Sequence, residues 1–388
     1  MTVLLIIFQH FSIVKPAGYE ITILLVLLPV WLLNCFQLSR TFKLNSIIWY
    51  LFFLVYPLIN FLTIYSVVEF LKTYLQFVLC ISVFFLVYNA RYKIERSTLL
   101  KAIKISQTIL ILFLLLQYLV VIQLKMDGLY NPWGMFSWKY PLPRDEYNFF
   151  RMKGFYLEPS YVAFISFTLF ICRFFLENKI SIINIVISIC CLLLINSSFG
   201  FLAFGLMVPF INFNRFKGVS KLFIVAVSLL PFILLPDLLS VLLNVTKLNN
   251  LSYESYSSAY TRWVFPINLT SYIFSKGYYL GYAMGQLDPI ISDFDLIIIQ
   301  SEESGVSNSL ASLTIYFGIA TIIILFFLLL KFLKGNDHVK IYILYILICL
   351  SNTGAFNSIE FFFSAIILPF IALKLTKNEI EHNNSLLQ

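Results

Sequence analysis

SLASLTIYFGIATIIILFFLLL, residues 309–330, contains no charged residue. A helix that crosses a membrane needs about 20 consecutive, mainly apolar residues. The stretch therefore predicts a spanning helix over 307–333, and similar stretches recur along the whole chain. The other spans that we expect are 20–37, 46–66, 71–89, 105–124, 159–177, 221–242, 339–354 and 358–375.

Two further stretches need separate treatment. Residues 180–213 are too long for one straight helix, and Asn196-Ser197-Ser198-Phe199-Gly200 interrupts them, so we predict two short helices with a tight turn. Residues 2–15 are apolar but short, and they form either a first helix or a re-entrant piece. The prediction is an all-α polytopic membrane protein, a bundle of about 11–12 transmembrane helices.

Composition supports this class along the full 388 residues. The chain is 60% hydrophobic and 12% charged, whereas a soluble domain carries about 25% charged residues. No soluble fold of this length could cover so much apolar surface. Because the apolar segments run from end to end, we expect residues 1–388 to form a single membrane-embedded domain in the lipid bilayer.

Lysine and arginine placement predicts the orientation, since cytoplasmic loops are enriched in both. The larger share of the 27 basic residues lies in alternate loops. These residues are Arg40, Lys43, Arg91, Lys93, Arg96, Lys101, Lys104, Arg173, Lys179, Arg215, Lys217, Lys221, Lys331, Lys334, Lys340, Lys374 and Lys377. We therefore predict a multi-pass membrane protein with a cytoplasmic C-terminus. The net charge of +8 reflects topology, and no nucleic-acid partner is expected.

The same charge pattern places the long loops at about 125–158 and 243–306 outside the cytoplasm. The first loop carries Arg144, Arg151 and Lys153, and Glu158 stands just before the predicted helix start at Pro159. A carboxylate there is favoured by the helix dipole, so a purely structural role is also open. Likewise, Arg151 and Lys153 could simply anchor to lipid headgroups.

The second loop carries Arg262 at the head of an amphipathic stretch that we expect to lie in the membrane interface. Further on, Lys276-Gly277-Tyr278 precedes Gly281 and Gly285, and glycines permit a turn of the backbone close to a ligand. Asp288, Asp293, Asp295, Glu302 and Glu303 follow and are more typical of a solvated acidic loop than of a metal site. We expect no metal and no cofactor.

Cations beside a carboxylate at a membrane surface suit an anionic lipid headgroup, above all a pyrophosphate. Guanidinium groups bind phosphate oxygens directionally and remain charged. If the pyrophosphate is a leaving group, the cations stabilise the charge that develops on it. A carboxylate can take the proton of an attacking sugar hydroxyl.

At these residues the chain resembles the Wzy-type polymerases of O-antigen, capsule and exopolysaccharide, in the superfamily of the O-antigen ligases. The segments that carry the resemblance are Arg151–Ser160, Ile195–Gly200, Tyr260-Thr261-Arg262 with Gly277 and Gly281, Ser307–Leu310 with Gly318, and Asn352-Thr353-Gly354 with Glu360. The last pair fits the colanic-acid-polymerase-like branch. Their order agrees with the family over about 150–365.

The resemblance implies transfer of a growing glycan from undecaprenyl pyrophosphate to the non-reducing end of an incoming lipid-linked repeat unit on the periplasmic face. It implies that Arg151 and Arg262 hold the pyrophosphate, that Glu158 acts as or helps the base, and that Asn308 orients a substrate. Arg144, Lys153, Lys276, Gly277 and Tyr278 complete the predicted substrate-binding set. A chain-length regulator and a flippase of the pathway are the expected protein partners.

Two other functions remain open. An O-antigen ligase would typically have a histidine before the asparagine that corresponds to Asn308, and Ser307 stands there instead. A lipid-linked oligosaccharide flippase or transporter would place ionisable residues in mid-membrane, whereas the charges here cluster at the ends of the predicted spans. The polymerase is therefore the favoured reading.

Overall fold

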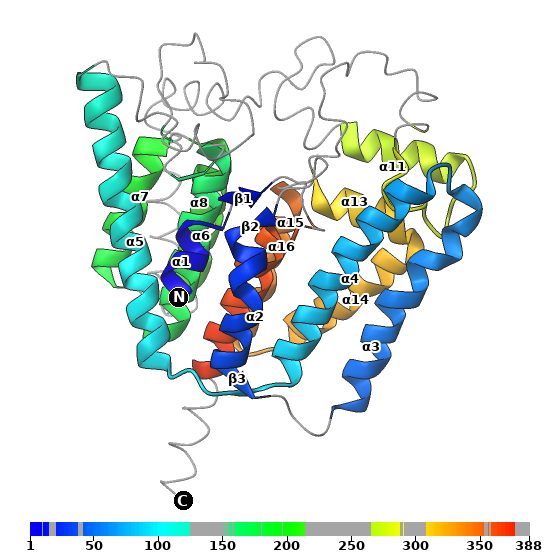
Figure 1. Ribbon diagram of the computed structural model, residues 1–388, viewed down its shortest axis with the longest axis horizontal. Helices are drawn as coiled ribbons and strands as arrows, with labels where there is room; N and C mark the ends of the chain where they lie inside the picture. The colour runs from blue at the N-terminus through cyan, green and yellow to red at the C-terminus, as the bar shows by residue number, and fades with distance from the viewer. Residues whose placement is uncertain are drawn as a thin grey trace, which may run out of the picture. The chain divides into compact units, whose positions relative to one another are not determined.

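The structure is a computed structural model that describes residues 1–9, 11–14, 21–37, 42–124, 152, 155–156, 159–179, 181–195, 197–213, 265–287, 290, 308–352, 356 and 358–376. The chain divides into two compact units, each made of separated segments. Unit 1 comprises Met1–Gln37, Arg91–Val245 and Phe363–Gln388, and unit 2 comprises Leu38–Ala90 and Thr246–Phe362. Figure 1 labels most of the helices and strands of the two units.

The described residues of unit 1 form helices and two short antiparallel strand pairs. Strand β1 (Ser12–Val14) pairs with β2 (Ile21–Thr22), and β3 (Phe36–Gln37) pairs with β4 (Arg91–Tyr92). Its helices are α1 (Thr2–Ile7), α2 (Ile23–Cys35), α5 (Arg96–Tyr118), α6 (Pro159–Glu177), α7 (Ile182–Ile195) and α8 (Ser198–Phe213). The π-helical turns η3 (Leu119–Gln123) and η7 (Phe363–Ile367) also belong to unit 1.

Helix α6 forms the core of unit 1. It packs against α5, α7 and α8, and its aromatic side chains, including Phe164, Phe167 and Phe170, are fully buried. A helix that is apolar on all sides is stable only when other helices or lipid surround it. The predicted division of 180–213 into two helices with a turn between them is confirmed by α7 and α8.

Unit 2 contains α3 (Leu44–Val55), the 3-10 segment η2 (Tyr56–Thr63), α4 (Val67–Asn89), α11 (Phe265–Ser275), α13 (Ser309–Phe317), α14 (Ile319–Lys334), α15 (Asp337–Asn352) and α16 (Ile359–Phe362). Aromatic rings fill its core: Phe317 packs against Phe53, Tyr56 and Phe77 at centroid distances of 5.8, 5.5 and 5.6 Å. Phe77 also meets Phe356 at 5.9 Å. Such ring pairs hold α3, α4 and α13 together.

The helix starts follow local rules of capping. The Ser66 hydroxyl accepts a hydrogen bond from the Glu69 amide at the start of α4, and the Thr22 hydroxyl accepts one from the Leu25 amide at the start of α2. Each such bond satisfies an amide that has no partner inside the helix.

The region 307–333 differs from the single spanning helix that its apolar sequence predicts. Helix α13 ends at Phe317, and α14 begins at Ile319. Gly318 between them has φ 52° and ψ −133°, a conformation that side-chain-bearing residues rarely adopt. The break places α13, nine residues long, against α11 and α15.

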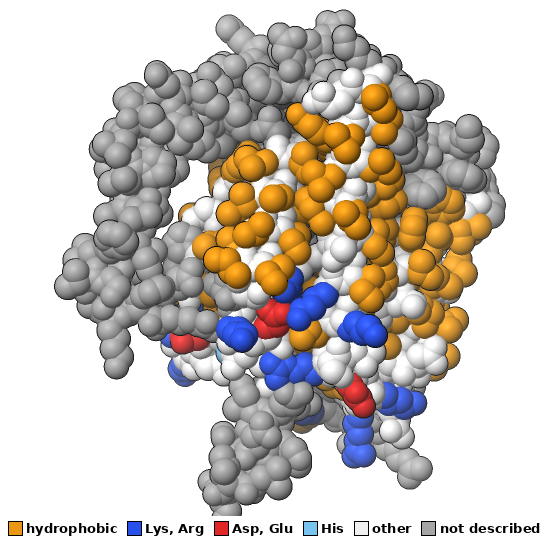
Figure 2. All heavy atoms as spheres, turned by 90° about the vertical axis from the view of Figure 1, so that its left-hand side faces the viewer, with side chains coloured by type: hydrophobic (Ala, Val, Ile, Leu, Met, Phe, Trp, Pro, Cys, Tyr) orange, Lys and Arg blue, Asp and Glu red, His pale blue; other side chains and the backbone are white. Residues whose placement is uncertain are grey.

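The chain is an all-α polytopic membrane protein. Among the described residues, the helices Val67–Asn89, Arg96–Val121, Ser160–Glu177 and Ile359–Thr376 are long and apolar enough to cross a membrane. Ile23–Cys35, Leu44–Asn60, Ile182–Ile195 and Phe199–Val208 are shorter apolar helices. Figure 2 shows a broad apolar surface with a band of Lys and Arg at its lower edge.

Candidate functional site

The structure describes four of the nine predicted site residues. Arg144, Arg151, Lys153, Glu158 and Arg262 lie outside the described residues, so their predicted roles stay predictions. Lys276, Gly277, Tyr278 and Asn308 are described, and all four belong to unit 2.

Three of these four lie in a loop, Lys276–Leu287, that follows α11 and that we call the glycine loop. Helix α11 ends because the chain turns at Gly277, whose φ is +88° and whose amide donates to the Phe274 carbonyl at 2.9 Å. A Cβ added at Gly277 would meet no heavy atom within 4 Å. The turn thus requires glycine for its backbone conformation and not for space.

The glycine loop lies directly against the break between α13 and α14. A Cβ at Gly281 would overlap the Tyr316 carbonyl, and a Cβ at Gly318 would overlap the Tyr279 carbonyl. Both glycines have positive φ. The backbone bonds that join the two segments are Tyr282 N to Ile315 O at 2.8 Å and Ile319 N to Tyr279 O at 2.9 Å.

Asn60, in the connection between α3 and α4, fixes this contact from a third side. Its side-chain amide donates to the carbonyls of Leu280 at 3.3 Å and Tyr316 at 3.2 Å, and its side chain is buried. The Tyr56 hydroxyl donates to the same Leu280 carbonyl at 3.1 Å. One polar side chain therefore bridges the glycine loop and α13.

Gln286 secures the far end of the loop to the start of α4. Its carbonyl oxygen accepts from the amides of Tyr65 at 2.9 Å and Ser66 at 2.8 Å, and its NH₂ group donates to the Ser66 carbonyl at 3.0 Å. The Ala283 amide donates to the Thr63 hydroxyl at 3.0 Å. The loop is consequently held by specific bonds at several points along its length.

Between these anchored points the loop exposes a short tip. Lys276 is exposed, with its ammonium 5.2 Å from the ring centroid of Tyr272. Tyr278 is 38% exposed and contacts Tyr282 edge-on at 5.2 Å, and Tyr279 is 56% exposed. A cation beside exposed tyrosine rings can bind a phosphate and a sugar face at the same time.

Asn308 caps the start of helix α13. It is buried at the start of α13, and its side-chain oxygen accepts from the Ala311 amide at 3.0 Å. Its carbonyl accepts from the Ser312 hydroxyl at 3.1 Å. Capping thus occupies the side-chain oxygen, and the role of Asn308 in orienting a substrate stays a prediction.

In unit 1, the residues that flank the predicted catalytic positions are well anchored. The Met152 amide donates to the Leu194 carbonyl at 3.2 Å, in the last turn of α7. The buried Tyr156 hydroxyl donates to the Ile6 carbonyl at 2.9 Å, and Phe155 stacks on Phe113 at 3.9 Å. These contacts fix the described residues Met152, Phe155 and Tyr156 to α7, α5 and α1.

The start of α8 is packed closely against α7 and α6. A Cβ at Gly200 would overlap Leu192 and crowd Ala163, so the glycine lets α8 approach α7 and α6. Ser197 is 1% exposed, and its hydroxyl has no hydrogen-bond partner among the described residues. Met152, which lies in the first of the motifs that the sequence singled out, bonds to Leu194 in the last turn of α7.

The comparisons identify the family. The family model described as WcaD colanic acid polymerase matches residues 1–375. The chain belongs to this family. A search of curated proteins returned no match. The match supports a polysaccharide polymerase. The predicted resemblance to the colanic-acid-polymerase-like branch is confirmed.

This family member also contains a polar cluster that the sequence reasoning missed. Arg173 was counted with the basic residues of the cytoplasmic side, at the end of the predicted span 159–177, and the structure places it inside α6 with its side chain 5% exposed. Its Nε donates to Glu177 at 3.0 Å, and its Nη1 donates to Gln107 at 3.0 Å. The signal that could have found it is the four-residue spacing of Arg173 and Glu177, which places both on one helix face.

Proposed function

We propose that the protein polymerises lipid-linked repeat units on the outer face of the bacterial cytoplasmic membrane. The acceptor is the non-reducing sugar of an incoming repeat unit, and the donor is the growing glycan on undecaprenyl pyrophosphate. The observation that carries the reaction class is the polymerase family match over residues 1–375. The orientation, with a cytoplasmic C-terminus, is supported by the alternation of basic loops along the sequence.

In the proposed reaction an acceptor hydroxyl oxygen attacks the anomeric carbon of the donor glycan. The bond from that carbon to the pyrophosphate oxygen breaks, and undecaprenyl pyrophosphate leaves. Arg151 and Arg262 are proposed to bind the pyrophosphate, because guanidinium groups can stabilise the negative charge that accumulates on it. The hydroxyl proton passes to the Glu158 carboxylate.

The exposed tip of the glycine loop supports a binding role for Lys276 and Tyr278. Lys276 is exposed beside an aromatic ring, and the loop that presents it is anchored by Asn60 and Gln286. A preorganised loop loses little conformational freedom when a ligand binds. We propose that Lys276 contacts a phosphate and that Tyr278 stacks against a sugar, with Arg144 and Lys153 as further cations.

The test is complementation of a strain that lacks the gene, read as a ladder of surface polysaccharide on a gel. Arg151→Ala, Arg262→Ala and Glu158→Ala are each expected to abolish long chains while the protein still inserts. Lys276→Gln is expected to shorten the chains, and Lys334→Gln, which removes a cation at the basic end of α14, should leave the ladder unchanged.

The species that accumulates in the deletion strain separates the enzyme classes. A single capped repeat unit supports the polymerase. Long lipid-linked polymer that is not attached would instead identify a ligase, and single units trapped on the cytoplasmic leaflet would identify a flippase. Unchanged chain length in the Arg151, Arg262 and Glu158 variants together would overturn the site assignment.

A further inference from the structure

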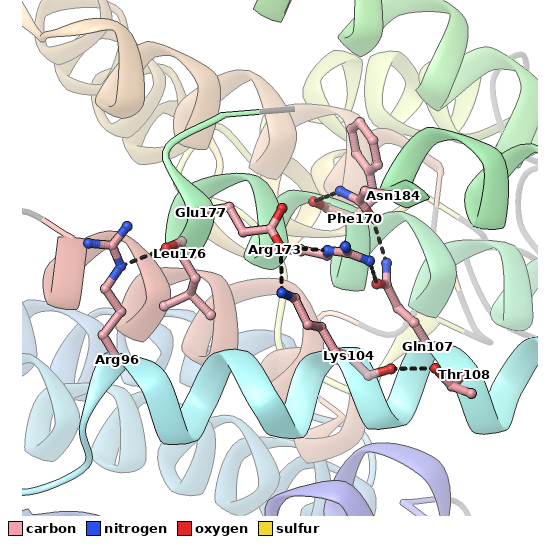
Figure 3. Close-up of polar contacts among 9 residues, drawn as sticks. All are labelled: Arg96, Lys104, Gln107, Thr108, Phe170, Arg173, Leu176, Glu177 and Asn184. Atoms are coloured by element: carbon pink, nitrogen blue, oxygen red, sulfur yellow. Dashed lines mark hydrogen bonds and ion pairs between the residues drawn. The ribbon is translucent and has the colours of Figure 1, made fainter. Parts of the chain in front are cut away.

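The polar cluster of unit 1 carries an inference about lipid. Figure 3 shows its members on three neighbouring helices: Lys104 and Gln107 on α5, Arg173 and Glu177 on α6, and Asn184 on α7. Gln107 donates to Asn184 at 2.8 Å, and Asn184 donates to the Phe170 carbonyl at 3.2 Å. The chain of bonds ties α5 to the end of α6 and the start of α7.

The charges of this cluster do not balance. Lys104 lies 2.9 Å and Arg173 3.0 Å from the same oxygen of Glu177, so two cations share one carboxylate and the sum is +1. The other carboxylate oxygen, Oε2, is buried and has no hydrogen-bond partner among the residues that the structure describes. Since a surplus positive charge at a membrane surface attracts anionic headgroups, a counter-anion from outside the protein would stabilise the cluster.

Lys104 is the member of the cluster that can reach such an anion. Its side chain is 46% exposed, compared with 9% for Glu177 and 5% for Arg173. An ammonium has three N–H donors, and in the described part of the chain the ammonium of Lys104 has Glu177 as its only partner. The remaining donors are available at the surface of α5.

Four further exposed cations lie near the ends of the same helices. Arg91 and Lys93 precede α5, Lys101 lies on its second turn, and Lys179 follows α6. The Arg96 side chain donates to the Leu176 carbonyl at 2.6 Å, which joins the start of α5 to the end of α6. We call Arg91, Lys93, Lys101, Lys104 and Lys179 the basic patch; Glu95 is the exposed acid among them.

The basic patch borders an apolar surface made by α5 and α7, which pack against each other. Ile105 and Leu112 of α5 and Ile183 and Val186 of α7 are 40%, 60%, 58% and 53% exposed. Figure 2 shows this boundary, with apolar side chains above a band of Lys and Arg. Lys104 lies about 12 Å along α5 from Arg96, next in sequence to the exposed Ile105.

We propose that the basic patch binds the phosphate of an anionic phospholipid, whose acyl chains lie along α5 and α7. Lys104 is the central contact, because it joins the headgroup to the Glu177 and Arg173 cluster. On the orientation predicted from the basic loops, this lipid belongs to the cytoplasmic leaflet. The bound lipid supplies the missing negative charge and stabilises the packing of α5, α6 and α7.

Native mass spectrometry of the purified full chain in detergent tests the proposal, with titrations of phosphatidylglycerol and, separately, phosphatidylcholine. Lys104→Gln should weaken phosphatidylglycerol binding about fivefold and leave phosphatidylcholine binding unchanged. Lys104→Arg should retain the affinity. Lys334→Gln is the matched control and should bind as the wild type does.

Equal phosphatidylglycerol affinity for Lys104→Gln and the wild type would overturn the proposal, and so would an equal loss in Lys334→Gln. Full displacement of the lipid by millimolar inorganic phosphate would identify a site for free phosphate instead. Should Lys104→Gln fail to fold, Lys101→Gln and Lys179→Gln, which lie outside the helix-joining cluster, must each reduce the affinity. The readout needs no polymer synthesis, so it is independent of the proposed function.

Discussion

At the scale of single residues, Gly277 and Gly281 are a natural pair for comparison. Both have positive φ, +88° and +101°, so alanine strains the backbone at either position by about 1–2 kcal/mol. Only at Gly281 would the new Cβ also overlap the Tyr316 carbonyl. Alanine at Gly277 therefore strains only the backbone, whereas alanine at Gly281 also disturbs the packing against Tyr316.

We expect Gly281→Ala to lower the thermal unfolding temperature in detergent clearly more than Gly277→Ala, because it must also disturb the bond from Tyr282 to Ile315. Polymer length should fall in parallel. Equal unfolding temperatures for the two variants would mean that the contact between the glycine loop and α13 contributes little to stability.

Asn308 is the residue at which a structural and a functional role compete. Serine is as good a helix cap as asparagine but lacks the NH₂ group. If Asn308 only caps α13, Asn308→Ser should retain both stability and polymer synthesis, and Asn308→Ala should lose about 1 kcal/mol. Should Asn308→Ser keep its unfolding temperature but lose polymer synthesis, the NH₂ group acts on substrate.

At the scale of elements, hydropathy predicted where helices occur better than where they end. The turn between α7 and α8 was predictable, because polar residues and Gly200 interrupt an apolar run. The break at Gly318 was not, since one glycine in an apolar run is common in spanning helices. What requires it is the carbonyl of Tyr279, a residue about forty positions earlier in the chain.

The polar cluster shows the same limit of sequence reasoning. Arg173 follows an apolar run, so counting charges groups it with the basic residues of the cytoplasmic side. Inside α6, Arg173 bonds to Gln107 and to Glu177, and Glu177 also pairs with Lys104. Gln107 and Lys104 belong to another helix, α5. Polar residues inside spans become interpretable only when the neighbouring helices are known.

At the scale of the whole molecule, both compact units are built from separated parts of the chain. Unit 1 takes segments from the beginning, the middle and the end, and unit 2 takes Leu38–Ala90 and Thr246–Phe362. The glycine loop depends on Asn60 and Tyr56, more than 200 residues earlier. Neither unit can complete its own contacts until synthesis is well past the middle of the chain.

This interleaving predicts how the chain behaves when it is divided between Phe216 and Lys217, in the segment predicted to be cytoplasmic. Fragment 1–216 would contain α3 and α4 without the glycine loop, and fragment 217–388 the reverse. Buried groups such as the Asn60 amide and the Tyr316 carbonyl would lose their partners, which costs about 1–3 kcal/mol each.

Each fragment expressed alone is therefore expected to be degraded, whereas co-expression of both should restore full-length protein levels and polymer synthesis. Pulse-chase labelling gives the fragment lifetimes, and the polysaccharide ladder reports assembly. A chain in which the two fragments are rejoined by a short Gly/Ser linker controls for the cut itself. The contrary result is that fragment 1–216 accumulates alone with a wild-type lifetime. In that case the α3–α4 hairpin would persist without the contacts between Asn60 and the glycine loop. The discontinuous units would then assemble from independently stable pieces.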